Sequence, residues 1–218
     1  MISLQNEYIS EVNINPWDDI DSEILNINAL NICSCHDTNS FGNLTGSDKF
    51  SLLFYNINSL SKNLDNFYST IINEPYKPKL LAFCETKLDP NFEKLYSIPG
   101  YSNLFTSKNS NSGGLALFVE ENIKCEILNN FSYMYDFIES LCVEIILGNE
   151  TFVVCVIYRR PGSDFDQFIV RYADILRSFS NKKCIICGDF NLNLLAFETS
   201  NVIESFVNVL INCIDASK

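Results

Sequence analysis

The stretch Lys183-Cys-Ile-Ile-Cys-Gly-Asp-Phe-Asn191 indicates the fold class of this chain and the place of its chemistry. A short β-favouring apolar run ends at a glycine, and an acid and an amide, Asp189 and Asn191, follow two residues apart. Residues two apart on an extended chain point the same way, so these side chains are expected to converge at the strand end. Ligands of α/β proteins bind at the carboxyl ends of strands. The stretch predicts a polar site there, although an acid after a glycine is also typical of an ordinary turn.

Three apolar runs upstream end in polar residues in the same way. A strand over 50–57 ends at Asn56 and Asn58, a strand over 80–84 delivers Glu85, and a strand over 151–158 ends at Tyr158. Each residue taken alone has an ordinary interpretation as a turn former, a solvated strand end or a rim aromatic. Four such strand ends in one chain predict a shared site.

The remaining pattern predicts strands that alternate with amphipathic helices. Residues 141–147 and 151–158 form a hairpin pattern about a Gly-Asn turn, and 115–120 is expected to pair with 123–128 through Glu121 and Asn122. Apolar residues at helical spacing predict three helices. The first has Ser59 or Ser61 as its N-cap and apolar residues from Leu64 to Ile72. The others extend from Asp164 as N-cap to Phe179 and over 203–214.

Charge divides the chain into two parts. The 218 residues carry a net charge of −12, which at first sight disfavours a nucleic-acid partner. Residues 1–48 hold eight acids and no Lys or Arg, which leaves 19 acids, 15 bases and a net −4 for the rest. We expect an acidic, poorly ordered extension over 1–48 and one domain over 49–218. An enzyme that binds phosphate through a metal tolerates mild acidity, since the cation is the largest local charge.

Cysteine usage and hydropathy bear on the compartment. Most of the nine cysteines lie in strand-like apolar runs, which is typical of free thiols in a reducing compartment. Cys33, Cys35 and His36 invite a zinc interpretation, but the other close pair, Cys184 and Cys187, is expected to point to opposite faces of its strand. Neither a secretory signal nor a membrane-length apolar run is present. We expect an intracellular monomer without disulfides, nuclear or cytoplasmic.

The sequence resembles the endonuclease/exonuclease/phosphatase superfamily, in particular the apurinic-type endonuclease domains of non-LTR (LINE-type) retrotransposons. The resemblance extends from near Phe50 to near Leu195. Six blocks carry it, in order: Tyr55-Asn-Ile-Asn-Ser-Leu60, Phe83-Cys-Glu-Thr-Lys-Leu88, Ile98-Pro-Gly-Tyr101, Gly113-Gly-Leu-Ala-Leu-Phe-Val119, Ile157-Tyr-Arg-Arg-Pro161 and Gly188-Asp-Phe-Asn191. The resemblance implies a four-layer α/β sandwich, in which two mostly antiparallel sheets are flanked by helices.

The resemblance also implies hydrolysis of phosphate esters with Mg²⁺ or Mn²⁺, and DNA as the substrate. Glu85 matches the metal-binding glutamate, and Asn56 matches the asparagine that helps to hold the metal and the phosphate. Tyr158 matches the tyrosine that contacts the phosphate. Asp189 would position or deprotonate the attacking water, and Asn191 would hydrogen-bond the phosphoryl oxygen. This is metal-assisted displacement with preorganised donors.

One departure from the family pattern leaves alternatives open. Family members continue past Gly-Asp-Phe-Asn to a second aspartate and then an Asp-His pair, whereas the only histidine here is His36. We therefore expect a C-terminally truncated domain that lacks its last strands. Three functions are compatible with this: a DNA-nicking endonuclease of retroelement origin, a non-catalytic retroelement remnant, and a phosphatase of the same superfamily. The retroelement-like Tyr-Arg-Arg-Pro block weighs against the phosphatase.

Overall fold

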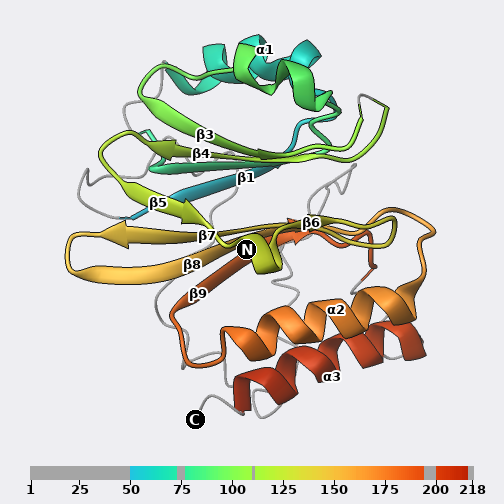
Figure 1. Cartoon of the computed structure of the whole chain (residues 1–218). Helices are drawn as coiled ribbons and strands as arrows, with labels where there is room; N and C mark the ends of the chain where they lie inside the picture. The colour runs from blue at the N-terminus through green and yellow to red at the C-terminus, as the bar shows by residue number, and fades with distance from the viewer. Residues whose placement is uncertain (1–49, 73–76, 110, 194–199, 216–218) are drawn as a thin grey trace, which may run out of the picture. The chain divides into compact units, whose positions relative to one another are not determined.

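The computed structural model describes residues 50–72, 77–109, 111–193 and 200–215. In this part the chain forms two β-sheets with helices on their outer sides (Figure 1). The strand order is β1-β2-β4-β3 in one sheet and β5-β7-β8-β9 in the other, where β6 also pairs with β7. The strands are β1 (Leu52–Asn56), β2 (Leu80–Cys84), β3 (Tyr101–Thr106), β4 (Leu115–Glu120), β5 (Lys124–Ile127), β6 (Tyr133–Met134), β7 (Glu139–Leu147), β8 (Glu150–Tyr158) and β9 (Cys184–Asp189). The helices are α1 (Leu60–Ile72), α2 (Phe165–Ser178) and α3 (Asn201–Asp215), with 3₁₀ turns η3 (Pro90–Leu95) and η4 (Asn129–Phe131).

Alternation along the buried strands assigns successive residues to different cores. Every residue of β2 is buried, yet Leu80 and Ala82 face the other sheet while Leu81 and Phe83 pack against α1. The same alternation operates in β4 and β8, since successive side chains on a strand point to opposite faces. The central strands are therefore nearly continuous apolar runs, because both of their faces are covered.

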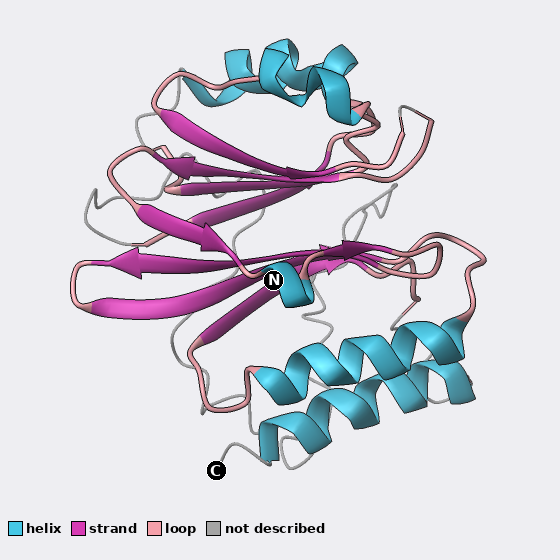
Figure 2. Cartoon of the chain, viewed as in Figure 1, coloured by secondary structure: helices cyan, strands magenta, loops and turns pink. Residues whose placement is uncertain are grey.

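The result is four layers, as Figure 2 shows. The core between the sheets draws residues from both of them. Helix α1 covers the outer face of the first sheet, and α2 and α3 cover the outer face of the second. Asp164 begins α2 as expected, since its Oδ1 accepts a hydrogen bond of 3.0 Å from the Gln167 backbone N–H. The predicted α/β sandwich is confirmed.

Two parallel pairs bring the carboxyl ends of four strands to one place. Most neighbouring strands are antiparallel, but β1 runs parallel to β2, and β8 runs parallel to β9. In the register of these pairs Asn56 lies opposite Cys84, and Tyr158 lies opposite Asp189. The polar residues predicted to share a site thus lie at the same end of their sheets.

The pairing predicted for 115–120 with 123–128 is wrong. Strand β4 pairs with β2 and β3, whereas β5 pairs with β7 in the other sheet. The two strands differ in burial: β4 is buried on both faces, which suits the centre of a sheet, while β5 alternates between exposed and half-buried residues. The residues between them carry the chain from one sheet to the other instead of forming a hairpin.

Other expectations have mixed outcomes. Cys187 lies in the core between the sheets and Cys184 on the helix side, so the two thiols point to opposite faces as predicted. The expected extension over 1–48, with Cys33, Cys35 and His36, lies outside the described residues. Within the described ranges, none of the helices has the length and apolar character needed to cross a membrane.

Candidate active site

Three polar side chains lie on the inward faces of strand ends because they continue the alternation of the core. Each comes two positions after a strand residue that belongs to the core between the sheets. They are Asn56 of β1, Tyr158 of β8 and Asp189 of β9. Glu85 follows directly after β2. Packing of the two sheets therefore brings these four residues together, although they come from four separate segments.

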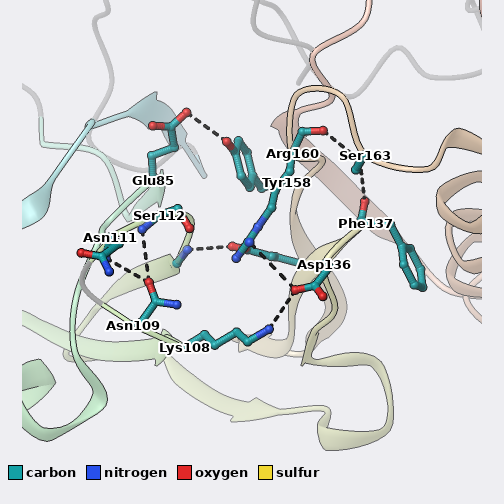
Figure 3. A network of polar contacts seen from close by, with 12 residues as sticks. Glu85, Lys108, Asn109, Asn111, Ser112, Asp136, Phe137, Tyr158, Arg160 and Ser163 are labelled. Atoms are coloured by element: carbon teal, nitrogen blue, oxygen red, sulfur yellow. Dashed lines mark hydrogen bonds and ion pairs between the residues drawn. The ribbon is translucent and has the colours of Figure 1, made fainter.

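Hydrogen bonds join the four side chains into one cluster. The Asn56 amide Nδ2 donates to Oε1 of Glu85 at 3.2 Å and to Oδ2 of Asp189 at 3.1 Å. The Tyr158 hydroxyl donates to the same Oε1 of Glu85 at 3.1 Å (Figure 3). One asparagine thus bridges two carboxylates, and one carboxylate oxygen receives donors from both sheets.

The turn after β2 holds Glu85 in an unusual backbone conformation. Glu85 has φ 53° and Lys87 has φ 50°, values that residues other than glycine seldom adopt. Such strain persists only where neighbouring groups enforce it. Here the Thr86 N–H donates to the Gly114 carbonyl at 3.1 Å, and the Lys87 N–H donates to the Gly113 carbonyl at 2.8 Å. The Gly-Gly segment therefore fixes the turn that presents Glu85.

The side chains of Glu139 and Thr86 lie so close to the backbone of Gly113 and Gly114 that only glycine fits at these two positions. A Cβ on Gly113 would lie 2.0 Å from Oε1 of Glu139, and a Cβ on Gly114 would lie 2.2 Å from Oγ1 of Thr86. Both positions have positive φ, of 67° and 90°. Glycine adopts this conformation without a steric penalty and leaves room for the two neighbouring side chains.

Glu139 anchors the Gly-Gly segment from the other sheet. Its side chain is fully buried, and its Oε2 accepts a hydrogen bond of 2.7 Å from the Gly114 N–H. Its Oε1 accepts from Nε and Nη2 of Arg160 at 3.0 and 2.9 Å. Burial raises the pKa of Glu139, although the Gly114 and Arg160 donors oppose that shift. A buried carboxylate with three donors is a rigid support for the segment beneath Glu85.

The electrostatics of the cluster favour an ionised Glu85 and a protonated Tyr158. Burial alone would raise the pKa of Glu85, but hydrogen bonds from Asn56, Lys87 and Tyr158 and the charge of Lys87 lower it below its ordinary value. Lys87 Nζ lies 3.1 Å from Oε2 of Glu85 and also donates to Oδ1 of Asn58. Burial, and then the Glu85 charge, raise the pKa of Tyr158, so its hydroxyl remains a donor.

Asn191 is held differently from the other predicted residues. The extended conformation expected through Asn191 ends at Asp189, because Asn191 has φ 48°. Its backbone N–H donates to Oδ1 of Asp189 at 3.1 Å, while its side-chain amide donates to the Arg159 carbonyl at 2.8 Å. The backbone of Asn191, rather than its side chain, contacts the cluster.

Comparison with known proteins identifies the family. The model of the endonuclease/exonuclease/phosphatase family matches residues 53–202, which is more than half of the chain. The chain belongs to this family. A search of curated proteins finds no match.

Solved structures share the fold of this endonuclease/exonuclease/phosphatase chain at low sequence identity. The endonuclease domain of TRAS1, a telomere-specific non-LTR retrotransposon, has a TM-score of 0.56 and 13% identity over 76% of this chain and 71% of that one. An AP endonuclease from Leishmania major has a TM-score of 0.55 and 14% identity over 89% and 78%. A 3′ phosphatase from Neisseria, bound to a product DNA hairpin, has a TM-score of 0.50 and 15% identity over 74% and 70%.

The family is generally divalent-metal dependent, and the donors of the cluster suit a hard cation. Glu85 presents an ionised carboxylate whose side chain is 21% exposed, and the Asp189 carboxylate accepts from the same Asn56 amide nitrogen. Oδ1 of Asn56 accepts from the Asn58 N–H at 3.2 Å, so the two carboxylates are the oxygens that this amide nitrogen joins. No group of three or more His, Cys, Asp or Glu side chains that could hold a metal lies within the described residues. Mg²⁺ is commonly held by only one or two carboxylates, with waters and substrate phosphate completing its shell. The residues present therefore fit such a cation.

Sequence reasoning missed three contributors to this arrangement. Lys87 and Arg160 lie inside blocks that resemble the family, but their contacts depend on neighbours distant in sequence. Glu139 opens an apolar strand, and nothing in its local sequence indicates that its carboxylate turns inward. The pair Gly113-Gly114 was the available signal, because adjacent glycines often mark a close backbone approach.

Proposed function

We propose that this chain is a metal-dependent phosphodiesterase of retroelement origin that nicks DNA. The observation that carries the proposal is the hydrogen-bonded convergence of Asn56, Glu85, Tyr158 and Asp189 from four strand ends. Carboxylates, an amide and a phenol at one point are what metal-assisted phosphate chemistry requires. The family match supports the reaction class, and the fold shared with a retrotransposon endonuclease domain supports the branch.

Asp189 is the group that takes a proton from the attacking water. Its Oδ2 accepts a hydrogen bond from the Asn56 amide, and its Oδ1 accepts one from the Asn191 N–H. The two bonds hold the carboxylate in one orientation. The water oxygen bonds to phosphorus while one P–O ester bond breaks, the water proton passes to Asp189, and the leaving oxygen takes a proton from solvent. Because two donors already orient the Asp189 carboxylate, it does not have to reorient when the water proton is transferred.

Tyr158 supplies a hydrogen bond to the phosphate. Because its pKa is raised, the hydroxyl is protonated at neutral pH and donates. In the free chain it donates to Glu85, so it is already directed toward the reacting centre. A Mg²⁺ or Mn²⁺ ion held by Glu85, and by Asn56 once its Oδ1 turns from the Asn58 N–H, would neutralise charge on the phosphate when bound.

One side-chain donor of Asn191 is already used within the free chain. Its side-chain amide is directed at the Arg159 carbonyl, at 2.8 Å. The amide nitrogen carries a second N–H, which is the donor left for a phosphoryl oxygen while this bond is kept. In the free chain Asn191 holds the loop after β9 against the end of β8.

Two other functions are weighed by specific observations. A non-catalytic remnant would keep this cluster of side chains without carrying out hydrolysis. A phosphatase is favoured by the shared fold of the 3′ phosphatase from Neisseria. The position of Asp189 within the cluster favours hydrolysis over the remnant, because the acceptor for a water proton is in place.

Nicking of supercoiled plasmid tests the proposal. The purified chain with Mg²⁺ or Mn²⁺ should convert plasmid to the open circle, and Glu85→Gln should lower that rate by about 10²–10³-fold. The matched control is Glu120→Gln, which removes a carboxylate paired with Lys79 at the opposite end of β2. Equal nicking by Glu85→Gln and the control would reject the assignment of Glu85. A folded chain that does not nick would favour the remnant, and release of phosphate from a 3′-phosphorylated oligonucleotide without nicking would favour the phosphatase.

A further inference from the structure

The Arg160 guanidinium is bound to a buried carboxylate on one edge and is exposed to solvent on the other. Two of its guanidinium nitrogens, Nε and Nη2, are bound to the fully buried Glu139. The guanidinium is a planar fork with five N–H donors, so anchoring one edge fixes the direction of the other. The remaining nitrogen, Nη1, points to the surface, where the side chain is 23% exposed. Arg160 therefore presents a preorganised donor group two residues after Tyr158.

An exposed carboxylate occupies the space in front of that donor group. Oδ1 of Asp136 lies 4.0 Å from Nη1 of Arg160 and 2.8 Å from Nζ of Lys108. Its side chain is 81% exposed, and the Lys108 hydrogen bond and charge lower its pKa, so it is ionised at neutral pH. The Lys108 loop is shaped by Asn109, whose Oδ1 accepts from the backbone N–H groups of Asn111 and Ser112. One anionic oxygen thus bridges two cations from different segments (Figure 3).

We infer that Lys108 and Arg160 bind a backbone phosphate of DNA beside the scissile one, and that Asp136 stands in for this phosphate in the free chain. The inference rests on the proposed function and adds a second phosphate contact to it. Figure 3 draws Arg160 beside Tyr158, with Asp136 between Arg160 and Lys108 and with Lys108 farther from Glu85. The same neighbourhood is linked by bonds, because Glu139 holds both Arg160 and the Gly114 N–H under the Glu85 turn.

The exchange of carboxylate for phosphate is favourable on physical grounds. An exposed ion pair contributes little net stability, so displacement of Asp136 costs little. A DNA phosphate can accept from both cations, and their binding releases condensed counterions from the duplex. Anchoring by Glu139 keeps Arg160 in place during the exchange, so no side-chain ordering is required at that residue. Because the chain has a net charge of −12, DNA can bind favourably only where cations are grouped locally, as Lys108 and Arg160 are.

The experiment measures binding of a fluorescein-labelled DNA duplex in EDTA by anisotropy, across a series of salt concentrations. Asp136→Asn should tighten binding about two- to fivefold, because a competing anion is removed. Lys108→Gln should weaken binding and lower the slope of log K against log salt by about 1. Both residues are exposed and support no buried group, so these variants should fold as the parent does. The matched controls are Glu150→Gln and Lys183→Gln, an exposed pair 3.0 Å apart at the other end of β8.

Each outcome decides the inference. Shifts in opposite directions for Asp136→Asn and Lys108→Gln, both larger than in their controls, support the phosphate site. Variants that bind like their controls would overturn it, as would a parent chain without salt-dependent affinity for DNA. Because no metal is present, the result is independent of hydrolysis: loss of nicking in Glu85→Gln tests the proposed function, and these binding curves test the phosphate site alone.

Discussion

The side-chain amide of Asn56 donates a hydrogen bond of 3.1 Å to Oδ2 of Asp189, and the two residues lie 133 positions apart in the sequence. They end β1 and β9, which are edge strands of different sheets within the described part of the chain. The bond therefore exists only when the two sheets are packed face to face. In this domain the candidate site and the core between the sheets form together.

Asn56→Asp tests how strongly the two carboxylates depend on that amide. The change replaces a donor with a third negative charge beside Glu85 and Asp189. In EDTA and low salt the free energy of unfolding should fall by about 1–3 kcal/mol, and Mg²⁺ should restore more stability to the variant than to the parent. Urea unfolding with and without Mg²⁺ measures both effects. Asn66→Asp on the exposed face of α1 is the matched control, and equal behaviour of the two variants would contradict the bridging role.

Gly113→Ala tests the close approach beneath Glu85. The added Cβ would lie 2.0 Å from the buried Glu139 carboxylate at a φ of 67°. Gly100→Ala is the control, since Gly100 has a φ of 85° and no heavy atom within 4 Å of the added Cβ. Both variants bear the cost of a positive φ, but Gly113→Ala should lose about 1–3 kcal/mol more. Equal losses in thermal or urea unfolding would mean that only the backbone conformation matters there.

Much of the candidate site could be predicted because its residues follow apolar strands in the sequence. Asn56, Glu85, Tyr158 and Asp189 each end or follow such a run, and strand parity directs three of them inward. Their direct contacts could not be predicted, because these depend on how two sheets pack. Nor does local sequence reveal the turn at Asn191, whose positive φ is held by contacts with Asp189 and with the end of β8.

The pairing of strands was the least predictable part of the fold. Leu115–Glu120 and Lys124–Ile127 are close in sequence, and proximity favoured a hairpin that the structure does not contain. The difference lies in the burial of both faces of β4, and local sequence does not show that the other sheet and helix α1 cover these faces. Glu139 escaped prediction for a related reason: an acid at the start of an apolar strand is usually solvated, and here three donors from other segments allow its burial.

Glu139→Gln tests the buried carboxylate through the pH dependence of stability. In the unfolded chain this group loses its proton near its ordinary pKa of 4.5, whereas the folded chain keeps the proton to a higher pH. The folded state therefore binds more protons in that interval, and the contribution of Glu139 to the free energy of unfolding falls as pH rises through its folded pKa. Glu85 has the opposite sign, since its lowered pKa adds stability that is lost as pH falls, but it is present in both proteins.

Urea unfolding of the parent and Glu139→Gln between pH 4 and pH 7 isolates this contribution. The parent's stability minus that of the variant should decrease as pH rises and then level off. A difference that stays constant or increases with pH would show that the folded pKa of Glu139 is not raised.

A double-mutant cycle on Glu85 and Asp189 shows whether residues from the two sheets act as one catalytic unit. The measurement is the single-turnover rate of plasmid nicking with Mg²⁺ for the parent, Glu85→Gln, Asp189→Asn and the double variant. Residues of one unit are non-additive, so each single variant should lose about 10²–10³-fold and the double variant little more than either. If instead the losses multiply in the double variant, the two carboxylates act independently and do not form a single shared site.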